Sequence, residues 1–74
     1  MENEKLIYKF KKNYLEDVCI MMGDYNGKSL IDIRSFINDG KSEMKPTRKG
    51  ISIRADLISE LRKGIEEAER EHNK

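Results

Sequence analysis

Hydrophobic and polar residues alternate in four segments of the chain, with the period of two that a β-strand shows when one face is buried. Turn-forming residues separate the segments, and the clearest of them is Asn26-Gly27, a pair that tolerates the positive φ angles of a tight hairpin. The polar residues 1–4 that precede the first segment are expected to be frayed. The pattern predicts strands at residues 6–11, 18–22, 28–37 and 44–53.

The hydrophobic period changes to that of a helix after residue 54. An aliphatic stripe lies on one face of a helix that we predict over residues 55–72. One helix covers only one face of a four-stranded sheet, so we expect part of the stripe to pack on the sheet and the rest against a second copy. The predicted fold is α+β with the order β-β-β-β-α. The stripe, and thus the expected dimer interface, consists of Leu57, Ile58, Leu61 and Ile65.

Alternation within the third segment divides its side chains between two faces of the sheet. Ile31 and Ile33 are expected to face the helix. The opposite face is expected to remain open and basic, and it is our candidate binding site, although Phe36 fits the core equally well. This open face carries Lys28, Leu30, Asp32, Arg34 and Phe36.

The fourth segment does not follow strict alternation. If Ile51 and Ile53 face the core, a period of two also places three polar residues of the same strand there. A bulge or sharp bend at Gly50 would remove the conflict, and so would a strand that projects beyond the helix. Pro46 favours an edge position or a bulge. Both interpretations remain open.

Composition limits the class of protein. A chain of 74 residues suffices for one domain, and so small a domain is marginally stable unless it self-associates. Cys19 is the only cysteine and His72 the only histidine, which excludes a disulfide framework and a Cys/His zinc site. Cys19 is expected to be a small buried residue of the second strand. With a single thiol, no membrane-spanning stretch and no signal peptide, we expect a soluble intracellular protein.

The charge is unevenly distributed, although the net charge is only +1. Residues 26–54 contain seven basic and three acidic side chains, a local charge of +4. Such a basic, strand-borne surface suggests a polyanion, and nucleic acid is the commonest one. From the residues alone, a merely solvated charged face is an equally good interpretation.

The acidic residues allow one alternative, a metal-dependent nuclease site built from Asp24, Asp32 and Glu43. No motif orders these acids around a metal. Asp32 is better explained as an ion-pair partner of Arg34 or of a nearby lysine. We therefore expect no catalytic activity, no metal and no cofactor.

Two motifs carry a resemblance to a known family. The segment GKSLIDIRSF is followed, after a short acidic turn, by EMKPTRKGISI and an amphipathic helix. In this order they resemble the DNA-binding domain of the positive cofactor four family of transcriptional coactivators. The resemblance extends from about Val18 to Ala68. It implies a curved four-stranded antiparallel sheet followed by a kinked helix, paired as a homodimer through helices and sheet edges.

The resemblance also implies a function. Family members bind single-stranded or melted DNA with little sequence preference, some in transcription initiation and others in replication, recombination or repair. By position, Tyr25 is expected to stack on bases. Asn26 stands where the family often has a basic residue, and Ile37 stands where it often has a second aromatic that can stack. The other implied DNA contacts are Asn26, Lys28, Arg34, Phe36, Lys45, Arg48 and Lys49.

Two other binding functions remain open. The basic face could dock an acidic protein partner, such as an activator or polymerase surface. A curved basic sheet also accepts structured RNA. The sequence leaves undecided whether the N-terminal lysines contact nucleic acid or only keep an edge strand soluble. These lysines are Lys5, Lys9, Lys11 and Lys12.

Overall fold

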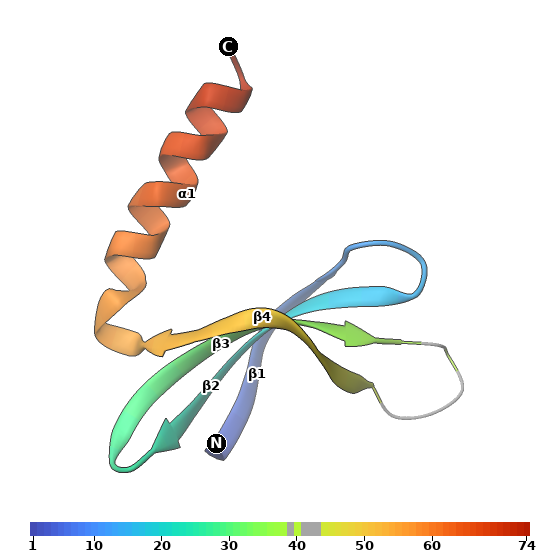
Figure 1. Cartoon of the computed structure of the whole chain (residues 1–74), viewed down its shortest axis with the longest axis vertical. Helices are drawn as coiled ribbons and strands as arrows, with labels where there is room; N and C mark the ends of the chain where they lie inside the picture. The colour runs from blue at the N-terminus through green and yellow to red at the C-terminus, as the bar shows by residue number, and fades with distance from the viewer. Residues whose placement is uncertain (39, 41–43) are drawn as a thin grey trace.

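The computed structural model describes residues 1–38, 40 and 44–74, and its elements follow the predicted order (Figure 1). The connection between the third and fourth predicted strands includes positions 39 and 41–43, which lie outside the described residues. The observed order of four strands and one helix confirms the α+β fold class. The elements are β1 (Glu2–Lys11), β2 (Glu16–Tyr25), β3 (Lys28–Ile37), β4 (Lys45–Arg54), the 3₁₀ turn η1 (Ala55–Leu57) and α1 (Ile58–His72).

The strands form one open antiparallel sheet in the order β1-β2-β3-β4. β2 and β3 pair in continuous register, with Tyr25 opposite Lys28 at one end and Glu16 opposite Ile37 at the other. The φ angles of residues 26 and 27 are 50° and 77°, which confirms the Asn-Gly hairpin turn. In Figure 1 the strands cross at a waist and splay apart on both sides, the appearance of a strongly twisted, curved sheet.

β1 and β2 are longer than alternation predicts. β1 begins at Glu2, so residues 2–4 form strand where a frayed segment was expected. β2 continues to Tyr25, so Gly23 and Asp24 belong to the strand and not to the turn. A Cβ on Gly23 would lie 2.9 Å from the Glu2 carbonyl oxygen. The close approach of β1 therefore depends on glycine at this position.

β4 bulges where alternation fails. Arg34 lies opposite Gly50 and Phe36 lies opposite Pro46, so three β4 residues stand across from Ser35 alone. The Thr47 hydroxyl donates a hydrogen bond of 2.8 Å to the Ser35 carbonyl and holds the bulge against β3. Of the two interpretations of this strand, the structure has the bulge.

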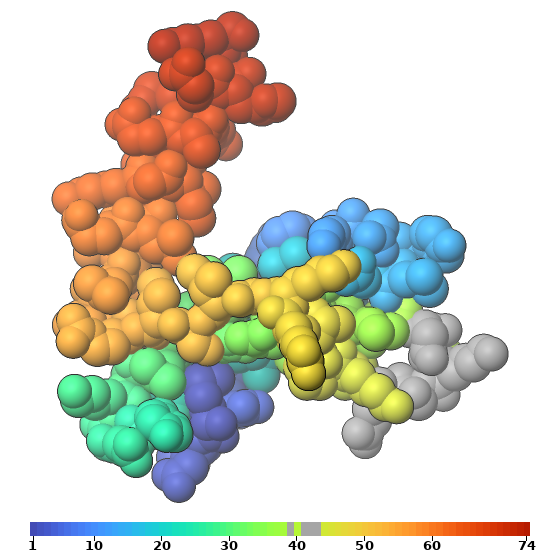
Figure 2. Space-filling view, in the orientation of Figure 1, coloured from blue at the N-terminus to red at the C-terminus, as the bar shows by residue number. Residues whose placement is uncertain are grey.

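The helix does not cover the sheet. The chain leaves β4 through η1, and α1 points away from the strands, with its main contacts to η1 (Figures 1 and 2). The expectation that Ile31 and Ile33 face the helix is wrong, because the chain turns outward at the end of β4. Among the described residues, the buried hydrophobic side chains are Cys19, as expected, and Ile31. A single copy therefore has a very small core.

Candidate nucleic-acid interface

Strand register assigns the side chains to two faces, because directly paired residues of antiparallel strands point to the same side. One side, which we call the apolar face, carries mostly aliphatic residues. The other, the polar face, carries most of the basic residues. The apolar face comprises Val18, Ile20, Met22, Ile31, Ile33, Ile51 and Ile53, and the polar face includes Lys9, Lys11, Lys28, Asp32, Arg34, Phe36, Ser52 and Arg54.

An ion pair occupies the centre of the polar face. The Arg34 guanidinium donates from Nε and Nη2 to the two Asp32 carboxylate oxygens, at 2.9 Å each, and from Nη1 to the Thr47 carbonyl at 3.0 Å. The Ser52 hydroxyl donates to Asp32 at 2.6 Å. Burial alone would raise the pKa of Asp32, but the hydrogen bonds from Arg34 and Ser52 and the Arg34 charge lower it. The interpretation of Asp32 as the partner of Arg34 is confirmed.

This pairing defines what Arg34 contributes to a binding site. Its guanidinium is half-buried and ties β3 to the β4 bulge, so its main role in the single chain is to hold the face in shape. A groove of about 350 Å³ runs beside it, lined also by Phe36, Pro46 and Met21. Phe36 is therefore on the open face, half-buried at the wall of this groove.

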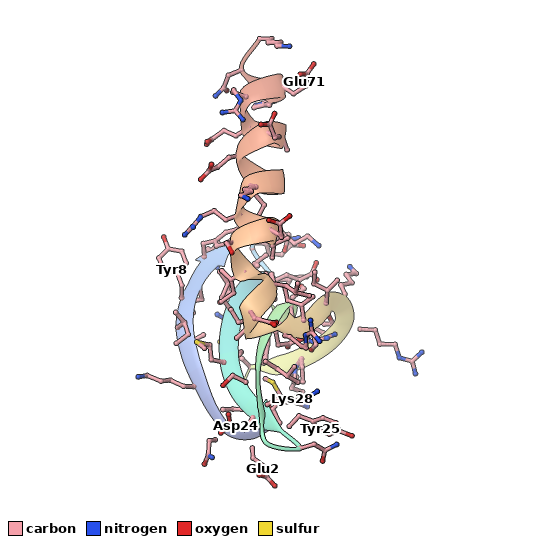
Figure 3. All side chains as sticks on the ribbon, turned by 90° about the vertical axis from the view of Figure 1, so that its left-hand side faces the viewer. Glu2, Tyr8, Asp24, Tyr25, Lys28 and Glu71 are labelled. Atoms are coloured by element: carbon pink, nitrogen blue, oxygen red, sulfur yellow. The ribbon has the colours of Figure 1, made fainter. Side chains whose placement is uncertain are left out.

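The tip of the β2–β3 hairpin presents an exposed aromatic ring beside a cation. The side chain of Tyr25 is 61% exposed, and Lys28 lies directly opposite it in the sheet. Figure 3 shows both residues at the end of the hairpin, whereas Tyr8 lies beside β1, at the other edge of the sheet. Asn26 forms the turn between them. A base stacked on Tyr25 would thus find an ammonium group next to its phosphate.

Arg54 is one of the seven basic residues of segment 26–54, but it is not among the predicted site residues. It lies on the polar face opposite Leu30, and with Lys28 it lines a groove of about 410 Å³ at the β4–η1 junction. Asp56 accepts a hydrogen bond of 3.2 Å from it. Because Ile53 was expected to face the core, alternation along the fourth strand already indicated that Arg54 faces the opposite side. The register of β1 against β2 also places Lys9 and Lys11 on the polar face.

A second basic cluster lies at the other end of the sheet, at the start of β4. It consists of Lys45, Arg48 and Lys49, all exposed. Lys45 lies opposite Ile37, nine residues along β3 from Lys28, and at ~3.3 Å per residue the two ends are about 30 Å apart. The structure therefore separates the predicted site residues into a hairpin-tip group and a β4 group.

Glu16 organises the β4 end of the sheet. Its carboxylate accepts hydrogen bonds from the Ser35 hydroxyl at 2.6 Å and from the Asn13 amide at 3.2 Å. The Lys49 ammonium lies 3.5 Å away and that of Lys12 lies 4.0 Å away. The hydrogen bonds from Ser35 and Asn13, helped by the two lysine charges, outweigh burial and lower the pKa of Glu16 from 4.5 to about 2.

This lowered pKa predicts an acid-sensitive contribution to stability. Because the folded-state pKa lies below the unfolded value, the contribution is complete above about pH 4.5 and is lost as pH falls through about 2. We expect Glu16→Gln to remove this part of the pH dependence, and Ser35→Ala to weaken it. Thermal unfolding followed from about pH 2 to pH 7 measures it. Parallel profiles for the wild type and Glu16→Gln would contradict the assignment.

The fold and the motifs agree with one family. The family model for Transcriptional Coactivator p15 (PC4) matches residues 18–64, from the third residue of β2 into α1. The chain belongs to the PC4 family.

Solved structures of a bacterial PC4 homolog have the same fold. The orthorhombic crystal form of BPSL1147 from Burkholderia pseudomallei K96243 is 31% identical, with a TM-score of 0.85 over 96% of both chains. Its tetragonal form is 30% identical, with a TM-score of 0.81 over 90% of this chain and 98% of that one. The resemblance seen in the sequence is thus confirmed across nearly the whole chain.

In this PC4-family chain the predicted dimer stripe is only partly buried. Ile58 and Leu61 are half-buried near η1, whereas Leu57 is 39% and Ile65 58% exposed. On the charged side of α1, ion pairs such as Lys63 with Glu60 lie along the helix surface. The helix therefore keeps an apolar strip that the described part of the chain leaves exposed at Leu57 and Ile65.

Of the three acids considered for a nuclease site, the two that the structure describes have other partners. Asp24 accepts a hydrogen bond of 3.1 Å from the Asn3 amide, Asp32 is engaged by Arg34, and Glu43 lies outside the described residues. Within residues 1–38, 40 and 44–74, no group of three His, Cys, Asp or Glu side chains is arranged to hold a metal ion. In the same part of the chain no helix has the length and hydropathy to cross a membrane.

Proposed function

We propose that this PC4-family chain binds single-stranded or melted DNA with little sequence preference. The observation that supports it most is the exposed Tyr25 ring beside Lys28 at the hairpin tip. Single-strand binders combine such stacking platforms with cationic surfaces, and the Lys45, Arg48 and Lys49 cluster supplies the latter. Arg34 acts mainly by holding the face in shape, and Phe36 offers a second, half-buried apolar contact.

We propose further that the binding unit is a homodimer. A single copy buries few hydrophobic side chains and leaves Ile51, Ile65 and Phe10 about half exposed. A second copy packed on these surfaces would supply the core that the sheet lacks. We propose a role in transcription regulation or in DNA replication, recombination or repair, inside the cell and without catalytic activity.

The direct test compares a labelled ~20-nucleotide single strand with a duplex of the same sequence by fluorescence anisotropy, across a salt series. We expect tight single-strand binding that weakens with salt, and clearly weaker duplex binding. A matched RNA strand tests sugar preference, because the 2′-hydroxyl is the systematic backbone difference. Absence of binding to any of them at low salt would favour the alternative, an adaptor that docks an acidic protein.

Two kinds of variant separate stacking from charge. We expect Tyr25→Ala to weaken single-strand binding by about tenfold or more, because each base stacked on an aromatic contributes ~1–3 kcal/mol. Tyr25→Phe, which keeps the ring, should bind nearly as well as the wild type. The double variant Arg48→Ala and Lys49→Ala should lower the affinity and reduce the salt slope by about 1–2. Lys63→Ala removes an exposed cation of α1 and is the control that should leave both unchanged.

A further inference from the structure

A groove at the β4 end of the sheet includes Lys49 of the basic cluster, but its other lining residues have no part in the proposed function. Its volume is about 530 Å³, larger than the groove beside Arg34. Three segments that are distant in sequence form it: the β1–β2 turn, the last residue of β3 and the first half of β4. Its lining residues are Asn13, Tyr14, Leu15, Glu16, Ile37, Thr47 and Lys49.

Tyr14 stands at this groove with its ring uncovered. Its side chain is 82% exposed, the largest exposure of any large hydrophobic residue in the described part of the chain. The backbone beneath it is nevertheless fixed, because the Asn13 side chain accepts hydrogen bonds from the amides of Leu15 and Glu16, at 3.0 and 2.9 Å. The Asn38 amide also donates to the Leu15 carbonyl, at 2.7 Å. The backbone of the turn is therefore already ordered, and binding would have to order only the Tyr14 side chain.

The groove combines this ring with an apolar floor. Ile37 and Leu15 are each 45% exposed, so they offer aliphatic surface but no π-face. A flat, largely apolar group that enters the groove would lie on this aliphatic surface with Tyr14 available to stack. Nucleobases have this shape, and every base has a π-face.

The charges around the groove favour an anionic occupant. Glu16 draws the ammonium groups of Lys49 and Lys12 to the same rim, at 3.5 and 4.0 Å. Figure 2 shows the yellow atoms of β4 reaching the blue β1–β2 turn. One carboxylate offsets only one of the two cations, and the exposed Lys45 begins β4 at the same end. Among the described residues of this rim, the positive charges outnumber the negative ones, and the Glu16 carboxylate is the group that would repel a phosphate.

We propose that this groove is a second base-binding subsite for single-stranded nucleic acid, in which Tyr14 stacks on a base and Lys49 and Lys12 receive the adjoining phosphate. The inference rests on the proposed function and extends it to a contact about 30 Å from Tyr25, measured along β3 at ~3.3 Å per residue. Register places Glu16 and Ile37 on the apolar side of the sheet, opposite Tyr25 and Lys28. Because the two subsites lie on opposite sides and at opposite ends of the sheet, they take different segments of strand.

The chain contains no tryptophan, which allows a site-specific test. Tyr14→Trp, Tyr25→Trp and Tyr8→Trp each introduce a single indole, in the groove, at the hairpin tip and on exposed β1 respectively. Titration with a ~16-nucleotide oligothymidine should quench the indole at positions 14 and 25, because both stack on bases. The indole at position 8 is the control and should change little. In anisotropy, Tyr14→Ala should weaken binding of the same strand by about tenfold, and Tyr14→Phe should restore it.

The outcomes distinguish this inference from the function on which it rests. Quenching at position 25 without quenching at position 14 would overturn the groove and leave the proposed function standing. Absence of any binding by anisotropy would overturn the proposed function itself. Equal quenching at positions 8 and 14 would show a general effect and overturn the groove as well. A change of position-14 emission with protein concentration, in the absence of nucleic acid, would show that a second copy fills the groove, which also overturns the inference.

Discussion

Gly50→Ala is expected to lower the free energy of unfolding by about 3 kcal/mol, at the upper end of what overpacking in a folded interior costs. A Cβ at this position would lie 2.5 Å from the Ile33 carbonyl oxygen and 2.8 Å from the Arg34 Cα. Both neighbours are backbone atoms of the central strand β3, so neither moves without breaking strand pairing. Gly50 is not among the residues with positive φ. The requirement for glycine is therefore steric.

The loss is large because the protein is small. At ~0.05–0.15 kcal/mol per residue, a chain of this length has a total stability of about 4–11 kcal/mol. A loss of about 3 kcal/mol corresponds to a fall in Tm of about 15 °C in a domain of this size. Denaturant unfolding and thermal unfolding, both followed by far-UV circular dichroism, measure the effect at a fixed protein concentration.

Gly64→Ala is the matched control, since it adds the same methyl group to another glycine. No atom lies within 4 Å of a Cβ at Gly64, in the interior of α1. Alanine there should stabilise the protein by about 1 kcal/mol through helix propensity. Opposite signs at the two glycines are the expected result. A Gly50→Ala protein as stable as the wild type would contradict the close packing of β4 on β3.

The parts of the fold that sequence predicts well are those that local rules determine. The hairpin at Asn26-Gly27 follows from the φ angles that this pair tolerates, and the observed angles agree. The two faces of β3 follow from strict alternation, which an antiparallel register preserves. The fourth strand breaks this alternation, and a bulge at Gly50 was one of the two predicted explanations. The observed bulge comprises residues 47–49, next to Gly50, and choosing between the two solutions required the register of β4 on β3, which sequence does not show.

The direction of the helix could not be predicted from the local pattern of the sequence. An amphipathic stripe indicates that a helix buries one side, but not against which surface. The expectation that it would cover Ile31 and Ile33 assumed that one chain completes its own core. The structure leaves that face uncovered and directs α1 outward.

The sequence predicted which residues form the candidate site better than it predicted how they are arranged in space. Motif and charge identified Tyr25, Lys28 and the basic cluster of β4, all of which are exposed. The separation of the two groups along β3, and the engagement of Arg34 by Asp32, depend on register and on hydrogen bonds between strands. The groove at Tyr14 gave no sequence signal, because it forms only where the β1–β2 turn meets β4.

Ile65→Asp is expected to weaken the proposed self-association at least ~100-fold, because each copy would carry an uncompensated charge into an apolar interface, at a cost of at least ~3 kcal/mol. Ile65 is the best position for this test, since its side chain is 58% exposed in the single chain. Leu61 is half-buried near η1, so Leu61→Asp would disturb the fold of one copy together with the assembly. Sedimentation velocity over a range of protein concentrations measures the association.

Ser59→Asp is the matched control, since it places the same carboxylate on the same helix. Ser59 is exposed in the first turn of α1, away from the aliphatic stripe, where a negative charge suits the helix dipole. We expect Ser59→Asp to sediment like the wild type. Because the single copy has so small a core, Ile65→Asp should also lose cooperative unfolding as it dissociates. A folded Ile65→Asp protein that sediments as the wild type does would remove α1 from the interface, and the uncovered apolar face of the sheet would then be left as the surface through which copies associate.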